Sequence, residues 1–350
     1  MSPDVPLSLA VVPLRALPEP AAPWWDTVLG VSVYGAARAA GIPDGVPRVS
    51  VDAPRLDADG AVCEVWRAAG PLRAGRVGRL HYRCNEQAMF GCIEFDEREA
   101  PCSGGGSALR RVSAQAYRAL FALLDELDYP GLLRVWNYFP AINAQVGGSE
   151  RYWQFNAGRQ DAFLAVGRST TDDVPAACAL GSASGPLALY FLALRGAPRP
   201  IENPRQVCAY HYPRQYGPRS PTFARGSVAG ATGANGAPLL FVSGTASIVG
   251  HRTLHAGDAL AQTEETFRNI EAVLAEARRV APACTAGLHE LAYKIYVRSP
   301  ADLAAVERSV RAHVGEHAPA VFLQADVCRA DLLVEIEACG GRAIVLENGR

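Results

Sequence analysis

Two carboxyl groups and one thiol near the C-terminus carry the strongest chemical signal in the sequence. Glu335 and Glu337 lie in the run 333–338, where apolar and acidic residues alternate. A period of two predicts a strand that sends both carboxyl groups to one face and the aliphatic side chains to the other. Acidic side chains are seldom buried without a partner or a task, and apolar surroundings raise a carboxyl pKa toward the range that a general acid needs. The thiol of Cys328 is expected within reach of Glu335.

These residues also have a structural interpretation. A single glutamate on a core strand is about as often a satisfied structural carboxylate as a catalyst, and Glu337 fits that role at least as well. Taken alone, Cys328 is more typical of a small buried residue than of a nucleophile, because no histidine stands beside it in the sequence. The chemistry therefore depends on what the fold brings to these side chains.

A segment rich in arginine and tyrosine, residues 211–226, is a candidate anion-binding site. It contains Arg214 and Arg225 together with Tyr212 and Tyr216. The planar guanidinium of arginine suits bidentate capture of carboxylates. Because the cluster is short and interrupted by prolines, a pocket for a small anion or a solvated loop is favoured over a nucleic-acid surface.

The C-terminal part of the chain predicts the elements that would position these groups. Strands are expected at 238–249, 290–297, 320–327 and 332–338, and helices at 259–277 and 299–314. In the first helix, apolar residues at i, i+3, i+6, i+7 and i+10 from Phe267 form one face. Ser299 is expected to cap the second helix, with Pro300 in its first turn. The order β-α-β-α-β-β suits a sheet with its helices on one side.

The earlier part of the chain repeats this order in pattern rather than in identity. It predicts strands at 87–95 and 132–139, helices at 113–127 and 149–166, and a buried strand at 187–194. The predicted fold class is therefore α+β, with two units of a sheet plus helices in tandem. We place the first domain at residues 1–200 and the second, which carries Glu335, at 201–350, with a Pro- and Gly-rich linker at 196–205.

Composition argues against several classes of function. The 350 residues carry a formal net charge of −1 with a pI near 6.7, which gives no global basic field for nucleic acid. Nine cysteines without CxxC spacing argue against a disulfide scaffold and a structural zinc site, and the i, i+4 histidine pairs lack an acidic third ligand. Residues 1–20 lack a signal-peptide pattern, and glycine, serine and proline interrupt the long uncharged run 176–194. We therefore expect a cytoplasmic protein without a metal, nucleic-acid or membrane partner.

The C-terminal part resembles the RidA/YjgF superfamily. The matching pieces are residues 242–245, 262–270, 294–297, 302–306 and 334–337. The resemblance implies that the units of the predicted fold are RidA/YjgF-like, with a chorismate-mutase-like arrangement of sheet and helices. In simple members of that superfamily, a Pro-Ala-Arg triplet supplies the arginine that binds the carboxylate of an imino acid. Here the triplet ends in Val321, which argues against imine deamination.

The whole chain resembles a specialised branch, the chorismatases, which cleave chorismate to pyruvate and a cyclic or aromatic acid. The resemblance rests on residues 152–159, 213–226 and 243–245, and on Cys328 with Glu335. Within that family, glycine at position 244 and cysteine at position 328 mark the members that release 3-hydroxybenzoate, in some cases with 4-hydroxybenzoate. The resemblance therefore implies an enzyme that acts on chorismate without a cofactor.

The same resemblance implies a role for each candidate residue. Glu335 would protonate the methylene carbon of the enolpyruvyl group, and Cys328 would direct the product. Gly244 would leave room for the substrate ring to approach the backbone. The residues expected to bind the substrate are Tyr152, Arg159, Tyr212, Arg214, Tyr216, Arg225, Gly244 and Thr245.

Two other functions stay open at this point. One is a RidA-like imine or enamine deaminase, and the other is a non-catalytic protein that binds a small anion in the same cleft. RidA-like domains commonly form trimers with sites between subunits, and a duplicated chain can satisfy such contacts internally. The sequence therefore allows a monomer or a homotrimer.

Overall fold

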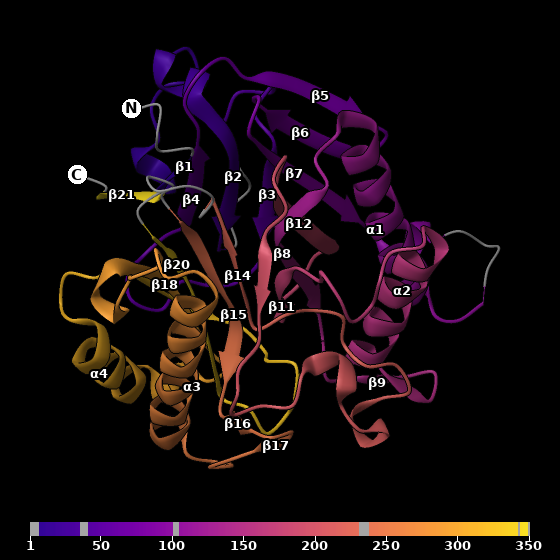
Figure 1. Ribbon diagram of the computed structural model, residues 1–350, viewed down its shortest axis with the longest axis vertical. Coiled ribbons are helices and arrows are strands. Elements are labelled where there is room, and N and C mark those ends of the chain that lie inside the picture. The colour runs from indigo at the N-terminus through magenta and orange to yellow at the C-terminus, as the bar shows by residue number, and fades with distance from the viewer. Residues whose placement is uncertain (1–6, 36–40, 101–104, 231–237, 342–343, 349–350) are drawn as a thin grey trace.

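The computed structural model describes residues 7–35, 41–100, 105–230, 238–341 and 344–348. Within these ranges, three large β-sheets surround one shared core, and four α-helices pack on the outer faces of two of the sheets (Figure 1). The fold is therefore α+β, as the sequence predicts. None of the helices in these ranges combines the length and the hydropathy that crossing a membrane requires.

The first sheet joins the two end segments of the chain. Its strand order is β21-β1-β4-β2-β3, and β1 pairs with β21 in parallel, with Leu7 opposite Ile344. On its outer face, apolar side chains of the sheet such as Val31 and Val65 pack with Trp25 of the 3-10 helix that precedes β2. The strands are β1 (Leu7–Pro13), β2 (Val28–Tyr34), β3 (Arg48–Val51), β4 (Val62–Arg67) and β21 (Ile344–Asn348).

The second and third sheets each contain six strands. The second has the order β11-β8-β12-β7-β6-β5 and the third the order β13-β14-β15-β20-β18-β19. The strands of the second sheet are β5 (Arg73–Val77), β6 (Leu80–Cys84), β7 (Ala88–Phe95), β8 (Gly131–Pro140), β11 (Ala176–Ser182) and β12 (Leu187–Leu194). Those of the third are β13 (Arg199–Ile201), β14 (Gly226–Ala229), β15 (Leu239–Ala246), β18 (Leu291–Val297), β19 (Ala320–Gln324) and β20 (Val334–Gly340).

Two helices cover each of these sheets. On the second sheet lie α1 (Ala108–Leu127) and α2 (Arg151–Ala165), and on the third lie α3 (Ala259–Val280) and α4 (Leu303–Val314). Side chains cap two helix N-termini, because Ser107 accepts a hydrogen bond from the Arg110 amide at 3.2 Å and Asp258 accepts one from the Ala261 amide at 2.9 Å. The predicted apolar face of α3, which begins at Phe267, packs on the third sheet, chiefly over β15 and β20.

The two helix-bearing units share one topology. Along the chain the second sheet runs β7-α1-β8-α2-β11-β12, and the third runs β15-α3-β18-α4-β19-β20. The corresponding strands also have the same neighbours, β11-β8-β12-β7 in one sheet and β19-β18-β20-β15 in the other. This agreement confirms the tandem order predicted from the sequence pattern.

Three local details differ from the sequence prediction. The first helix begins at Ala108, five residues before the predicted start. Ser299 makes no side-chain cap, and Pro300 opens a 3-10 turn that precedes α4. The sequence pattern predicts no strand before residue 87, yet four strands of the first sheet and two of the second lie there.

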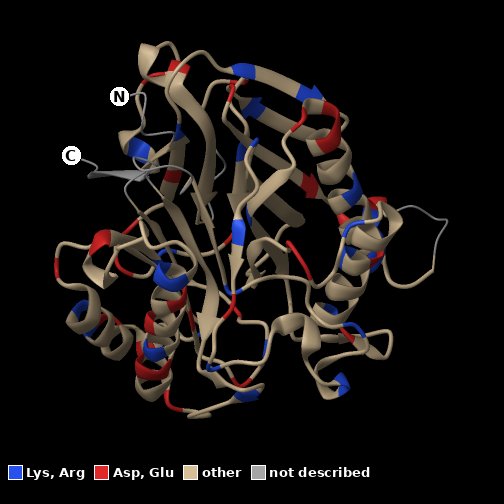
Figure 2. Cartoon of the chain, in the orientation of Figure 1, with Lys and Arg blue, Asp and Glu red and all other residues tan. Residues whose placement is uncertain are grey.

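Many charged residues belong to the helices and to the outer strands, as the colouring of Figure 2 shows. An exception lies inside the molecule, where the inner faces of the three sheets meet. There Lys294 of β18 is 3% exposed and forms ion pairs with Glu64 of β4 at 2.6 Å and with Glu337 of β20 at 2.8 Å. Arg134 of β8 also binds Glu337. Ion pairs as well as apolar contacts therefore hold the three sheets together in the shared core.

Candidate active site

A cavity of about 350 Å³ lies where the second and third sheets meet. Ser243 of β15 joins the sheets at this point, because its hydroxyl accepts a hydrogen bond from the Ala177 amide of β11 at 2.9 Å and donates one to the Ala224 carbonyl at 2.6 Å. The walls come from α2, β11, β15 and β20, from residues 206–225, and from the loop that precedes β20. Most of the residues predicted to be functional line this cavity.

Glu335 is the buried acid of the cavity. On β20 its side chain leaves the same face as Glu337, whereas Val334 and Ile336 pack under α3, as the period of two predicts. The side chain is 3% exposed, and burial together with the negative charge of Glu337 raises its pKa to about 8. Among the described residues, none forms a hydrogen bond with this carboxyl group, so its proton is available to a bound molecule.

Gly244 makes room for that carboxyl group. The register between β15 and β20 shifts between Val242 and Thr245, and this irregularity brings Gly244 against the Glu335 side chain. A Cβ at position 244 would overlap the Glu335 Oε1 atom and would lie 2.7 Å from its Cδ and 3.1 Å from the Cβ of Cys178. The glycine therefore leaves room for the acid, and its role in admitting a substrate ring stays a prediction.

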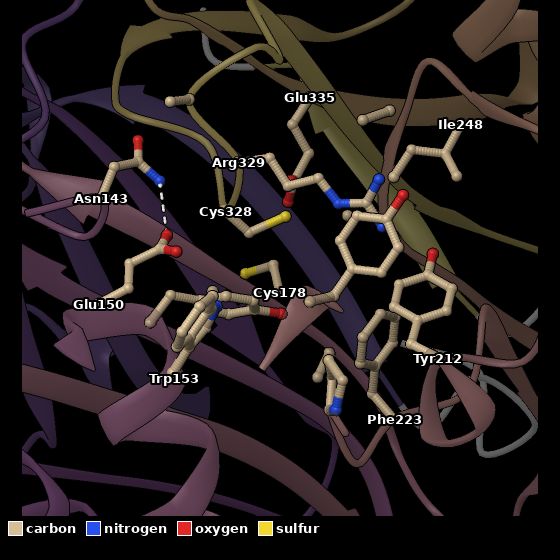
Figure 3. A pocket seen from close by; sticks show the side chains of 18 of the residues that line it. Asn143, Glu150, Trp153, Cys178, Tyr212, Phe223, Ile248, Cys328, Arg329 and Glu335 are labelled. Carbon is tan, nitrogen blue, oxygen red and sulfur yellow. Dashed lines mark hydrogen bonds between the residues drawn. The ribbon is translucent and has the colours of Figure 1, made fainter. Parts of the chain in front are cut away.

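Cys328 lies beside the acid, on the loop before β20, and Figure 3 shows its sulfur atom and that of Cys178 pointing into the cavity. Burial and the neighbouring Glu335 raise the pKa of Cys328 to about 12, so the group is a thiol rather than a thiolate. The loop is fixed to β11, where Asp326 and Gly181 exchange backbone hydrogen bonds of 2.7 and 3.0 Å. Arg298 binds Asp326 and donates to the Arg329 carbonyl at 2.9 Å.

Three arginines line the cavity, and within the described residues none of them has a carboxylate within ion-pair distance. Arg159 of α2 is 2% exposed, and its Nη2 donates to Asn156 at 2.8 Å. Arg225 is 5% exposed and donates to the Tyr212 hydroxyl at 2.7 Å. Each keeps a buried nitrogen without a partner, namely Nε of both residues. Such groups fit an anionic ligand.

Arg329 is the third of these arginines. Its guanidinium carbon lies 3.9 Å from the ring centroid of Tyr216 and 5.1 Å from that of Tyr212. One nitrogen donates to the His251 carbonyl at 2.9 Å, and the buried Nη2 atom has no partner among the described residues. The two tyrosine rings therefore hold a cation at the cavity wall.

The structure brings eight of the ten predicted site residues to the cavity: Tyr152, Arg159, Tyr212, Tyr216, Arg225, Gly244, Cys328 and Glu335. It does not bring Arg214 or Thr245 there. Arg214 is exposed in a 3-10 turn, and the Thr245 hydroxyl donates to the Ser243 carbonyl at 2.8 Å inside β15. Thr245 follows Gly244 in the strand and so leaves the opposite face.

Arg329, Cys178 and Glu150 are among the lining residues that sequence reasoning missed. A signal for Arg329 was present, because it directly follows Cys328 in the loop that was already assigned to the site. Glu150 and Cys178 carry no comparable signal, since each is placed by an element boundary or a strand face that only the fold defines. Among the described residues, no group of three His, Cys, Asp or Glu side chains is arranged to hold a metal ion.

The fold and this cavity define an α+β enzyme that binds a small anion beside a buried neutral acid. A chorismatase crystal structure superimposes with a TM-score of 0.84 at 33% identity, covering 96% of this chain and 98% of that one. A chorismatase from Streptomyces hygroscopicus is 36% identical over 319 residues, which is 89% of each protein. The chain belongs to the chorismatase family.

Two further comparisons cover parts of the chain. A 3-hydroxybenzoate synthase from Streptomyces hygroscopicus is 44% identical over 229 residues, which is 63% of this chain and 67% of that protein. The family model for the N-terminal part of FkbO/Hyg5-like chorismatases matches residues 64–193. That match runs from β4 to β12 and includes the helix that carries Tyr152 and Arg159.

Proposed function

We propose that this protein converts chorismate to 3-hydroxybenzoate and pyruvate. The observation that carries the proposal is the neutral, buried carboxyl group of Glu335 in a cavity lined by three arginines without carboxylate partners. Chorismate is a dianion with an acid-labile enol ether, so it needs both features. The 44% identity to a 3-hydroxybenzoate synthase and the residues Gly244 and Cys328 support the aromatic product.

The chemistry needs no atoms beyond those of chorismate. Glu335 gives its proton to the methylene carbon of the enolpyruvyl group, which makes the side chain a leaving group. The C4 hydroxyl oxygen then bonds to C3 while the C3–O bond breaks, pyruvate departs, and the hydroxyl proton returns to the Glu335 carboxylate. The resulting epoxide opens at C4–O and loses a ring-carbon proton as its oxygen gains one, which gives the phenol. Arginines that bind both carboxylates position the dianion for these steps.

Incubation with chorismate in D₂O tests the proposal. Pyruvate should form in equal amount with hydroxybenzoate, and mass spectrometry should find one solvent deuterium in its methyl group, because the new hydrogen comes from the exchangeable acid. Chorismate that remains unchanged across the pH range would overturn the proposed function. A parallel incubation with an imino acid tests deamination. We expect no deamination, because Val321 stands where a carboxylate-binding arginine would be needed, and its side chain is buried in the shared core and does not line the cavity.

Replacing Cys328 with alanine is expected to change the product rather than to stop turnover. The thiol lies beside Glu335 but is protonated, so it is suited to steering the ring or passing a proton and not to nucleophilic attack. We expect the share of 3-hydroxybenzoate to fall several-fold while pyruvate release stays within about tenfold of the wild type. Chromatography of the products measures both, and an unchanged product ratio would contradict this role. Cys339, a buried thiol that does not line the cavity, provides the matched control Cys339→Ala.

Replacing Gly244 with alanine is expected to leave the fold intact and to displace the acid. The new Cβ meets the end of the flexible Glu335 side chain, which can move, and the Cβ of Cys178, which is already at 3.1 Å. The proton donor should therefore shift, lowering kcat about tenfold and reducing the share of 3-hydroxybenzoate. A crystal structure of the variant shows the displacement directly. Wild-type products from a protein with an unmoved Glu335 would reject this account of the glycine.

We also propose that the protein acts as a monomer in the cytoplasm. The whole cavity is built from one chain, and the eight described cysteines are all free, which fits a reducing compartment. Light scattering at working concentration measures the mass. A trimer in solution would reject the monomer.

A further inference from the structure

Lys294 is the centre of a buried network that joins the three sheets. Its ammonium group lies within hydrogen-bond distance of Glu64 at 2.6 Å, of Tyr34 at 2.7 Å and of Glu337 at 2.8 Å. Glu64 and Tyr34 come from the first sheet and Glu337 from the third, and Tyr190 of the second sheet lies 3.3 Å from the same nitrogen. The network contains no solvent-exposed member, since Glu64, the most accessible, is 9% exposed.

The identity of residue 294 is informative in itself. Of the 34 lysine and arginine residues in the chain, Lys294 is the single lysine. This lysine stands where Glu64, Tyr34 and Glu337 all lie within 2.8 Å of one nitrogen atom. The ammonium group is compact and has three donors, whereas the planar guanidinium is larger. The site therefore requires a small, fixed positive charge.

Glu337 is the member of the network that lies nearest to the proton donor. Its Oε1 atom accepts hydrogen bonds from Trp136 at 2.9 Å and Tyr296 at 3.2 Å in addition to the Lys294 ion pair, and Arg134 binds its other oxygen. Burial alone would raise the pKa of Glu337, but Lys294 and Arg134 outweigh burial and lower it. This carboxylate is therefore ionised and cannot turn away.

Glu335 and Glu337 are two residues apart on one strand. Side chains at i and i+2 leave the same face of a strand about 7 Å apart. Both residues are at most 5% exposed, so little water screens the charge of one from the other. A carboxylate that is held ionised at this distance opposes the ionisation of its neighbour.

We propose that Glu337 is a positioning residue for the proton donor: the Lys294 network fixes a permanent negative charge one pleat away from Glu335, and that charge adds to burial in keeping Glu335 protonated at neutral pH. The inference rests on the proposed function, because it explains how Glu335 is protonated again before the next substrate binds. It assigns the network a role in the reaction besides its role in joining the sheets.

The other charged groups around Glu335 also affect the balance between its protonated and ionised forms. Arg134 and Arg225 oppose Glu337 by favouring the ionised form of Glu335. Without the Glu337 charge, the two arginines are the nearby charges that act on Glu335, and they lower its pKa. The titratable and charged groups that face Glu335, from all the elements packed against it, are Glu337, Arg134, Arg225, Tyr152, Cys178, Cys328 and Arg329.

The test is the pH dependence of kcat. In the wild type, kcat should fall as the pH rises through about 8, because the donor must be protonated. In Glu337→Gln, this alkaline limb should move to lower pH by about one unit or more. Glu337→Asp keeps the charge, so its limb should stay within half a unit or so of the wild type even if stability falls. Glu64→Gln is the matched control, since it removes an equal charge on the far side of Lys294 and should leave the limb in place.

A limb that does not move in folded Glu337→Gln overturns the proposal, because a purely structural role lowers kcat equally at every pH. If Glu337→Gln does not fold, the double variant Glu64→Gln/Lys294→Gln decides. It removes Lys294, the main cation that keeps Glu337 ionised, together with the carboxylate that Lys294 would leave unpaired, so the alkaline limb should again move to lower pH, and a limb that stays in place overturns the proposal. Infrared titration of the acid band that is lost in Glu335→Gln reports the same shift without turnover. That measurement separates a failure of this inference from a failure of the proposed function.

Discussion

Glu335→Gln is expected to reduce kcat about 10³-fold or more while leaving the binding of an inert chorismate analogue within a few-fold of the wild type. Glutamine fills the same space against Gly244 but has no proton to give to the methylene carbon. Pyruvate release measures kcat, and calorimetry measures binding. Retained turnover would reject Glu335 as the donor. Glu94→Gln is the control, because it makes the same change on strand β7, outside the cavity.

The same variant is expected to be more stable than the wild type at pH 8. Glu335 has an ordinary pKa of 4.5 when unfolded and a pKa of about 8 when folded, so the folded state holds a proton that the unfolded chain releases. The wild type therefore loses stability as the pH rises from about 4.5 to about 8, by about 3 to 5 kcal/mol in total. Glutamine does not titrate. The difference in unfolding free energy between the two proteins should widen over that window, and a constant difference would contradict the raised pKa.

Arg329→Met is expected to raise KM about 100-fold with a smaller effect on kcat. The guanidinium group is held between two tyrosine rings with a buried nitrogen free for a ligand, and charge-assisted hydrogen bonds to a carboxylate contribute about 1.5–3 kcal/mol. Methionine keeps the apolar contact with the rings but removes the charge. Steady-state kinetics with chorismate measures KM and kcat separately.

Arg214→Met is the matched control for that experiment. The sequence places Arg214 in the binding segment, whereas the structure places it exposed in a 3-10 turn outside the cavity. We expect a KM within about twofold of the wild type, since a surface charge at this range is screened. A large rise in KM for Arg214→Met together with a normal KM for Arg329→Met would reverse the assignment of the two arginines.

Local periodicity in the sequence was sufficient to predict the helices and strands in which apolar residues recur with a clear period. The alternation around Glu335 predicted β20 and its two faces, and the apolar spacing from Phe267 predicted α3. The first sheet could not be predicted in this way. Its pairing of β1 with β21 joins residues that are more than 300 positions apart in the sequence, and no local pattern encodes such a contact.

The candidate site was predictable where chemistry and spacing agree. Glu335, Cys328 and most of the arginines and tyrosines were named correctly as cavity residues, because their types fit the reaction that the resemblance implies. The errors concern direction rather than type. Thr245 and Arg214 stand beside true lining residues but point elsewhere. The contact of Gly244 with Glu335, which the sequence does not predict, joins residues that are 91 positions apart. Such orientations follow from strand faces and loop turns, which are decided by the whole fold.

Because its single lysine, Lys294, is buried, the folded chain should react little at lysine with reagents that modify this side chain. A protease that cuts only after lysine has one possible target in this sequence, and that target lies in the middle of β18 with 3% exposure. Cleavage at residue 294 therefore requires the three sheets to separate. The rate at which the intact chain splits into two fragments would report global opening from a single bond, without any engineered label.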